Sequence, residues 1–189
     1  MTLQPFSPDL AFLGSRDYLH GSTLFNVMID SLRYENIAPT DLDFIFERRT
    51  GNQVSIVPGE PDGPAVKVAT LRHAGGVLTA IETEEPITHR QPNVELALDK
   101  AFTLPAEAIT VQHIEAGYSF IATAIAAFKT ILQKREPERK FVFTRLRVPA
   151  IPEGAFSVTF HRKIGNRFYE GRIEATCQDA GAIYFGVWS

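Results

Sequence analysis

The chain carries one short pattern twice, and this internal repeat constrains the fold more than any other feature. The segment 21–33 has apolar residues at helical spacing, and a Phe-x-Phe-x-Arg strand pattern follows at 44–48. The segment 117–133 repeats the helical spacing, and the same strand pattern follows at 141–145. The helical segments begin 96 residues apart and the strand patterns 97 residues apart. The sequence therefore predicts an α+β fold made of two copies of one small unit.

Each predicted helix precedes a run of predicted strands. In the first half, 44–47 and 54–57 flank a Thr-Gly-Asn turn and predict one hairpin, and 65–71 with 77–82 predict a second. The second half predicts strands at 108–114, 139–148, 156–163, 168–177 and 183–188. The proline-punctuated stretch 85–105 predicts a linker, so we expect an N-terminal unit at 1–84 and a C-terminal unit at 106–189.

Composition excludes several classes of protein. The net charge of -3, from 19 basic and 22 acidic residues, argues against a general nucleic-acid binder. The single cysteine excludes an internal disulfide and a multi-cysteine metal cluster, and it fits a reducing compartment. Residues 1–7 carry no positive charge, so we expect no secretory leader, and the longest mainly apolar run, 114–128, is too short to span a membrane. We expect a cytoplasmic protein with no membrane span and no metal site.

A helix wrapped by a long antiparallel sheet resembles the hotdog fold of acyl-thioester proteins. The resemblance rests on the order strand, helix and about four strands, and it is clearest in the hairpin 156–175, which Gly165-Asn166 divides. It covers roughly 10–84 and 106–189. It implies a double hotdog, in which two tandem units form one continuous sheet around two central helices.

The resemblance also implies a chemistry. Hotdog proteins act mostly on acyl thioesters of coenzyme A (CoA) or acyl carrier protein (ACP), as thioesterases, 3-hydroxyacyl dehydratases or enoyl hydratases. It implies no cofactor apart from the coenzyme A or carrier pantetheine that belongs to the substrate. Its expected partners are therefore acyl-CoA or ACP, and exposed sheet edges favour a homodimer.

The resemblance places the thioester carbonyl at a helix N-terminus. Free N–H groups and the positive end of the helix dipole can hold an oxyanion there. Gly21 and Gly117 occupy that place, and the N–H groups of Gly21 and Ser22 are expected to polarise the carbonyl. In the preceding polar loop, Asp17 or His20 could activate water, since an imidazole has an unperturbed pKa of about 6.5. Asp17 could instead orient His20.

A helical amide weighs against dehydration. Asn26 stands five residues after Gly21, where dehydratases of the bacterial fatty-acid type carry a catalytic carboxylate. An amide takes up no proton, so Asn26 can only position water or polarise a carbonyl. The dehydratase histidine loop is also missing from the matching segment 12–15. The second half has the inert Ala122 at the corresponding position of its helix, and Glu115 could complete a site built from His20 or Asp17.

These residues favour a thioesterase-like hydrolase, with dehydratase or hydratase activity less favoured. The alternative is a non-catalytic acyl-CoA or acyl-carrier binding or assembly module, since a polar loop before a helix often only caps it. Basic residues on the second-half strands predict either a solvated sheet face or a surface that attracts phosphates or an acidic carrier. They are Arg145, Arg147, Arg162, Lys163, Arg167 and Arg172.

Overall fold

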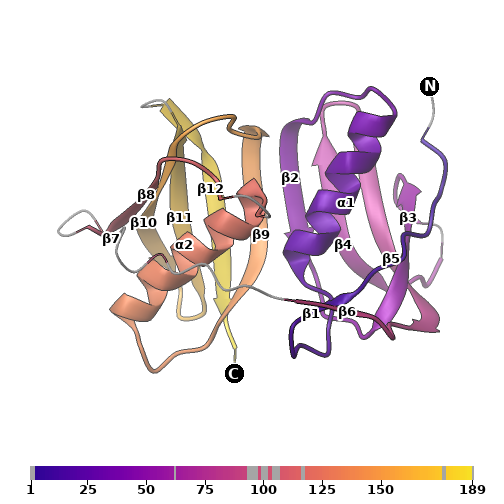
Figure 1. Cartoon of the computed structure of the whole chain (residues 1–189), viewed down its shortest axis with the longest axis horizontal. Helices are drawn as coiled ribbons and strands as arrows, with labels where there is room; N and C mark the ends of the chain where they lie inside the picture. The colour runs from indigo at the N-terminus through magenta and orange to yellow at the C-terminus, as the bar shows by residue number, and fades with distance from the viewer. Residues whose placement is uncertain are drawn as a thin grey trace. The chain divides into compact units, whose positions relative to one another are not determined.

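The computed structural model describes residues 3–61, 63–92, 98, 102–103, 107–115, 118–175 and 178–188. The chain divides into two compact units, Met1–Glu95 (unit 1) and Leu96–Ser189 (unit 2). Each unit contains one long helix that lies across an antiparallel sheet (Figure 1).

Unit 1 contains seven elements among its described residues. They are β1 (Phe12–Leu13), α1 (Gly21–Tyr34), β2 (Thr40–Phe46), β3 (Asn52–Pro58), β4 (Lys67–His73), β5 (Gly76–Pro86) and β6 (Arg90–Gln91). The sheet order is β3-β5-β4-β2, and β1 pairs with β6 in parallel. Part of the predicted linker is therefore tied to the strand that precedes α1.

The hydrophobic core of unit 1 forms where α1 covers this sheet. The buried face of α1 consists of residues that are at most 2% exposed: Leu24, Phe25, Met28, Ile29 and Leu32. The Phe25 ring meets Phe44 of β2 edge-on, with ring centroids 5.4 Å apart. Burying each such side chain contributes roughly 1.5–3 kcal/mol, so the apolar spacing in the sequence holds the helix on the sheet.

The first predicted hairpin of unit 1 is wrong, and the second is confirmed. Phe44 in β2 pairs with Leu71 in β4, whereas Ile56 in β3 pairs with Ala80 in β5. The segment between β2 and β3 is not a hairpin turn, because the carbonyl of Thr50 accepts the N–H of Leu19 at 2.8 Å. The segment thus runs along the loop before α1, and β3 joins the opposite edge of the sheet. β4 and β5 do form a hairpin that closes at His73 and Gly76.

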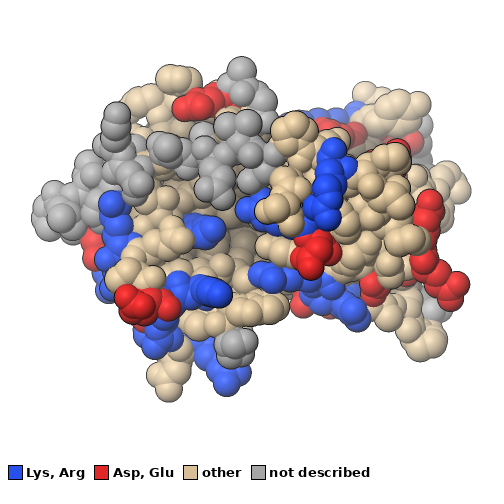
Figure 2. Space-filling model, turned by 60° about the horizontal axis from the view of Figure 1, so that its bottom comes forward, with Lys and Arg blue, Asp and Glu red and all other residues tan. Residues whose placement is uncertain are grey.

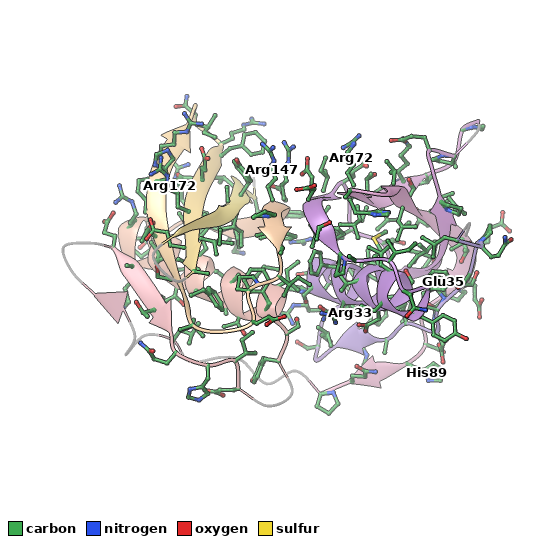
Figure 3. The ribbon with its side chains drawn as sticks, turned by 90° about the horizontal axis from the view of Figure 1, so that it is seen from above. Arg33, Glu35, Arg72, His89, Arg147 and Arg172 are labelled. Atoms are coloured by element: carbon green, nitrogen blue, oxygen red, sulfur yellow. The ribbon has the colours of Figure 1, made fainter. Side chains whose placement is uncertain are left out.

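Unit 2 contains one helix and six strands among its described residues. They are β7 (Phe102–Thr103), β8 (Ala108–Val111), α2 (Phe120–Arg135), β9 (Phe141–Ala150), β10 (Phe156–Ile164), β11 (Phe168–Ala175) and β12 (Gln178–Val187). The order is β9-β12-β11-β10-β8-β7, so β10, β11 and β12 form the predicted meander. Arg147 and Arg172 project from the sheet face that points away from the helix (Figure 3).

The helix of unit 2 begins three residues later than predicted. Ser119 is extended, with φ -101° and ψ 162°, and its hydroxyl accepts the N–H of Ala122 at 3.3 Å. A serine that caps a helix in this way sets its first residue at Phe120. Gly117, the predicted start, lies outside the described residues.

The C-terminal end of α2 is fastened to the sheet by Glu136. The Tyr169 hydroxyl donates to Glu136 Oε1 at 2.7 Å, and Lys163 Nζ donates to the same oxygen at 3.1 Å. These contacts, led by the Tyr169 hydrogen bond and joined by Arg139, hold the pKa of the Glu136 carboxyl below its ordinary value. Glu136 therefore joins the helix end to both strands of the β10–β11 hairpin.

Candidate functional site

The loop before α1 is held from two sides. The guanidinium of Arg90 donates to the carbonyl of Gly14 at 3.1 Å and to that of Arg16 at 2.6 Å. Leu19 is fully buried, and its N–H donates to the carbonyl of Thr50. These bonds fix the direction in which the chain enters α1.

His20 and Ser22 form the polar pair at the entrance of α1. His20 is the N-cap residue, with φ -85° and ψ 138°, but its side chain does not cap the helix. Instead, His20 Nδ1 lies 2.7 Å from Ser22 Oγ. When Nδ1–H donates to the Ser22 hydroxyl, Nε2 carries the lone pair that a general base requires. The Ser22 hydroxyl thus contacts the histidine ring, and no side chain at His20 caps the helix.

The first backbone donors of α1 have no partner within the described residues. Gly21 and Ser22 are buried, and Ser22 is 4% exposed. The N–H of Thr23 turns back to the carbonyl of His20 at 3.0 Å. In the part of the chain that the structure describes, no hydrogen bond is found for the N–H of Gly21 or of Ser22. A buried helix end usually satisfies these donors, so two N–H groups remain for a carbonyl or an oxyanion.

The structure brings Asn26 close to this pair and leaves Asp17 at the rim. Asn26 is partly exposed and stands one turn after Ser22, so the two side chains lie on the same helix face. Asp17 is exposed on the loop, and its backbone carbonyl packs against Gly51. Ser22 is a partner of the His20 ring in the structure, and the role of Asp17, as a base or in orienting His20, stays a prediction.

The N-terminal end of α2 differs chemically from that of α1. The hydroxyl of Ser119 accepts the N–H of Ala122. Ile125, which stands five residues after the start of α2 as Asn26 does after the start of α1, is buried and apolar. Glu115 is exposed, and its backbone carbonyl accepts the N–H of Tyr118 at 3.1 Å. The helix entrance of unit 1 is therefore the better equipped of the two for chemistry.

A partly buried carboxylate near the α1 entrance was not identified from the sequence. Glu82 of β5 has a side chain that is 17% exposed, and it accepts from the Thr50 hydroxyl at 2.5 Å and from Asn52 Nδ2 at 3.2 Å. Arg48 Nη2 lies 3.4 Å from its other oxygen. Because Thr50 also holds Leu19, Glu82 supports the loop that presents His20. The only sequence signal was an acid at the end of an apolar strand.

Within the described residues, no group of three His, Cys, Asp or Glu side chains could hold a metal ion. In the same part of the chain, no helix is long and apolar enough to cross a membrane.

No protein-family model matches the sequence, and no curated protein matches it in sequence. Solved structures do match the fold. A candidate thioesterase II from Thermobifida fusca is 13% identical, with a TM-score of 0.57 over 98% of this chain and 93% of its own. A candidate oleoyl thioesterase from Lactobacillus plantarum is 11% identical, with a TM-score of 0.50 over 98% and 95% of the two chains.

The chain has the hotdog fold. Both alignments run through unit 1 and unit 2, so each helix-and-sheet unit has its counterpart within a single neighbouring chain. In this hotdog protein, the two copies share an architecture and differ at their helix entrances. The arrangement of His20, Ser22 and two buried N–H groups occurs in unit 1.

Proposed function

We propose that the protein processes acyl thioesters and that it is a thioesterase-like hydrolase acting at the entrance of α1. The observation that carries the proposal is the pair of buried N–H groups at Gly21 and Ser22, beside a histidine held by a serine hydroxyl. A helix end of this kind stabilises negative charge on an oxygen, which is what acyl transfer requires. The two solved structures described above are both candidate thioesterases, which supports the same chemistry.

Each residue has a role in this mechanism. The thioester carbonyl oxygen accepts from the N–H groups of Gly21 and Ser22, and these donors stabilise the oxyanion of the tetrahedral intermediate. His20 takes a proton from water as the water oxygen bonds to the carbonyl carbon. The C–S bond then breaks, and the proton passes from His20 to the departing thiolate. The substrate brings its own pantetheine, so the mechanism uses no further cofactor.

The remaining predicted residues have supporting roles in the proposal. Asn26 positions the water or the carbonyl from the next turn of α1. Asp17 is the second candidate base, and its exposed position suits contact with the polar end of a substrate. Glu115 and Gly117 remain predictions for substrate binding.

Hydrolysis fits this entrance better than hydration or dehydration. Adding or removing water across a carbon–carbon bond requires an acid and a base on the substrate, whereas hydrolysis requires one base and an oxyanion site. The helix position that carries the catalytic carboxylate in dehydratases is occupied here by the amide of Asn26, which transfers no proton at neutral pH.

The second candidate function is a non-catalytic acyl-CoA or acyl-carrier binding or assembly module. The amide of Asn26 favours it, because the position lacks a titratable group. A pure binding module is stabilised by its ligand. A free ligand concentration of 100 times Kd raises the free energy of unfolding by about 2.7 kcal/mol. It produces no free thiol.

A single screen separates these functions. The full chain is incubated with acyl-CoA and acyl-ACP substrates of increasing chain length, and thiol release and melting temperature are both measured. The hydrolase predicts thiol release that falls in His20→Ala, with Asp17→Asn showing whether the second candidate base takes part. A ligand-induced rise in melting temperature without thiol release supports the binding module. No turnover and no stabilisation with any substrate would refute both.

The expected cytoplasmic homodimer is a separate proposal. A measurement of the molar mass in solution tests whether the protein is a dimer.

A further inference from the structure

Three large apolar side chains are exposed together at one end of the unit 2 sheet, and we call them the aromatic tip. Ile164, Phe168 and Trp188 are 40%, 48% and 51% exposed. Ile164 and Phe168 are cross-strand partners where the β10–β11 hairpin closes, and Phe168 is paired with Gly186 of β12. Trp188 stands two residues after Gly186, so it continues the same side of the strand.

The aromatic tip lies on the sheet face opposite to α2. Its alternating neighbours, Tyr169 and Phe185, are 1% exposed and face the helix. The Phe168 ring lies beside Gly186, since a Cβ there would meet Phe168 Cε1 at the ordinary contact distance of 3.5 Å. Isolated exposed apolar residues are common in proteins, but three adjacent ones form a surface patch that indicates a contact.

Cations surround the aromatic tip. The N–H of Trp188 donates to the carbonyl of Lys140 at 2.8 Å, and the N–H of Val187 donates to that of Arg167 at 2.8 Å. Arg162 precedes Ile164 by two residues on β10, and its side chain is 62% exposed while it pairs with Glu170. Lys140 and Arg167 are also exposed. These three cations form the basic rim of the tip.

Unit 2, which carries the aromatic tip, has a net positive charge, whereas unit 1 has a net negative charge. Unit 1 contains 7 basic and 13 acidic residues, whereas unit 2 contains 12 basic and 9 acidic residues. In Figure 2 the left half of the picture is unit 2, and blue Lys and Arg side chains gather on the end turned toward the viewer. The acidic character of the whole chain therefore conceals a basic end.

We propose that the aromatic tip and its basic rim bind the surface of an anionic lipid bilayer. Tryptophan is enriched at the boundary between lipid headgroups and hydrocarbon, and Phe and Ile can insert just below it. Lys and Arg beside them attract anionic headgroups. The hairpin end and the last strand project from one end of the sheet (Figure 1), which suits a deformable lipid surface. This inference does not depend on the proposed hydrolysis.

Trp188 makes a direct test possible, because it is the single tryptophan in the chain. Emission of the full-length protein is recorded with phosphatidylcholine vesicles and with vesicles containing about one quarter phosphatidylglycerol. Binding predicts a blue shift with the anionic vesicles, and brominated acyl chains should quench the emission. Lys140→Gln and Arg167→Gln should each weaken vesicle affinity about fivefold. Phe168→Ser should weaken it further.

A matched control lies in unit 1. Tyr34 is 85% exposed, and Tyr34→Ser removes a comparable aromatic surface without touching the tip, so it should bind vesicles as the wild type does. An unchanged emission spectrum with anionic vesicles would overturn the proposal, as would equal binding to neutral vesicles. A blue shift that depends on protein concentration without lipid would also overturn it, because a second copy of the chain would then cover the tip.

Discussion

Gly171 tests how closely the unit 2 sheet wraps its helix. It lies on β11 opposite the ring of Phe128 from α2, and a Cβ at this position would lie 2.6 Å from Cε2 and 2.7 Å from Cδ2. Ordinary contact begins at 3.4 Å, so the ring would have to retreat by most of an ångström. Phe128 is fully buried and meets Phe185 edge-on, with centroids 5.5 Å apart. The ring therefore has little space into which it can move.

Gly171→Ala should lower the free energy of unfolding by about 2 kcal/mol, in the middle of the range for overpacked cores. For a chain of this size, that corresponds to a fall in melting temperature of about 4–8 °C. Calorimetry and urea denaturation of the full chain measure it. Gly154→Ala is the matched control, because a Cβ there meets nothing within 4 Å, and it should stay within about 0.5 kcal/mol of wild type. The double variant Gly171→Ala/Phe128→Leu should lose less free energy of unfolding than the sum of the losses in the two single variants, because the smaller leucine makes room for the new Cβ. If Gly171→Ala melts with the wild type, the close packing described for α2 is wrong.

Two further predictions concern polar contacts. The pKa of Glu136 is held below 4.5 in the folded protein, mainly by the Tyr169 hydroxyl. The stability advantage of wild type over Glu136→Gln should therefore be complete above about pH 4.5 and vanish as the pH falls through the folded pKa; a difference that persists at pH 2 would contradict this. Thr50→Val removes the hydroxyl that donates to Glu82 and accepts the N–H of Asn52, and it should cost about 1–3 kcal/mol in urea denaturation. Thr50→Ser, which keeps the hydroxyl, should recover most of that loss, and equal losses in both variants would show that the hydrogen bonds contribute little.

The sequence predicted the parts of the fold that depend on local patterning. The apolar spacing of 21–33 identified α1, and the turn at Gly165-Asn166 identified the β10–β11 hairpin. The pairing of β3 could not be predicted in the same way. The Thr-Gly-Asn signal at 50–52 suits a tight turn locally, but Thr50 is bound to Leu19 and Glu82, which lie 31 and 32 residues away.

In the candidate site, too, local features could be predicted from the sequence and long-range contacts could not. His20 and Ser22 are two residues apart, so their proximity at a helix start was accessible from the sequence, although their hydrogen bond was not. The apolar spacing predicted that α2 begins at Gly117, but the hydroxyl of Ser119 caps the helix and sets its first residue at Phe120. Glu82 was missed because only the folded sheet brings it to Thr50.

The most direct test of the central proposal compares the two helix entrances in a single assay. The kcat/KM for acyl-thioester hydrolysis is measured for His20→Gln and Ser22→Ala in unit 1, with Ser119→Ala in unit 2 as the control. General-base catalysis contributes about 10²–10⁴-fold, so His20→Gln should lose at least 100-fold while the melting temperature stays near that of the wild type. Ser22→Ala should also lose activity because it releases the His20 ring, and Ser119→Ala should remain within about threefold of wild type after losing only a helix cap. Full activity in His20→Gln, or an equal loss in Ser119→Ala, would contradict the assignment of the site to the entrance of α1.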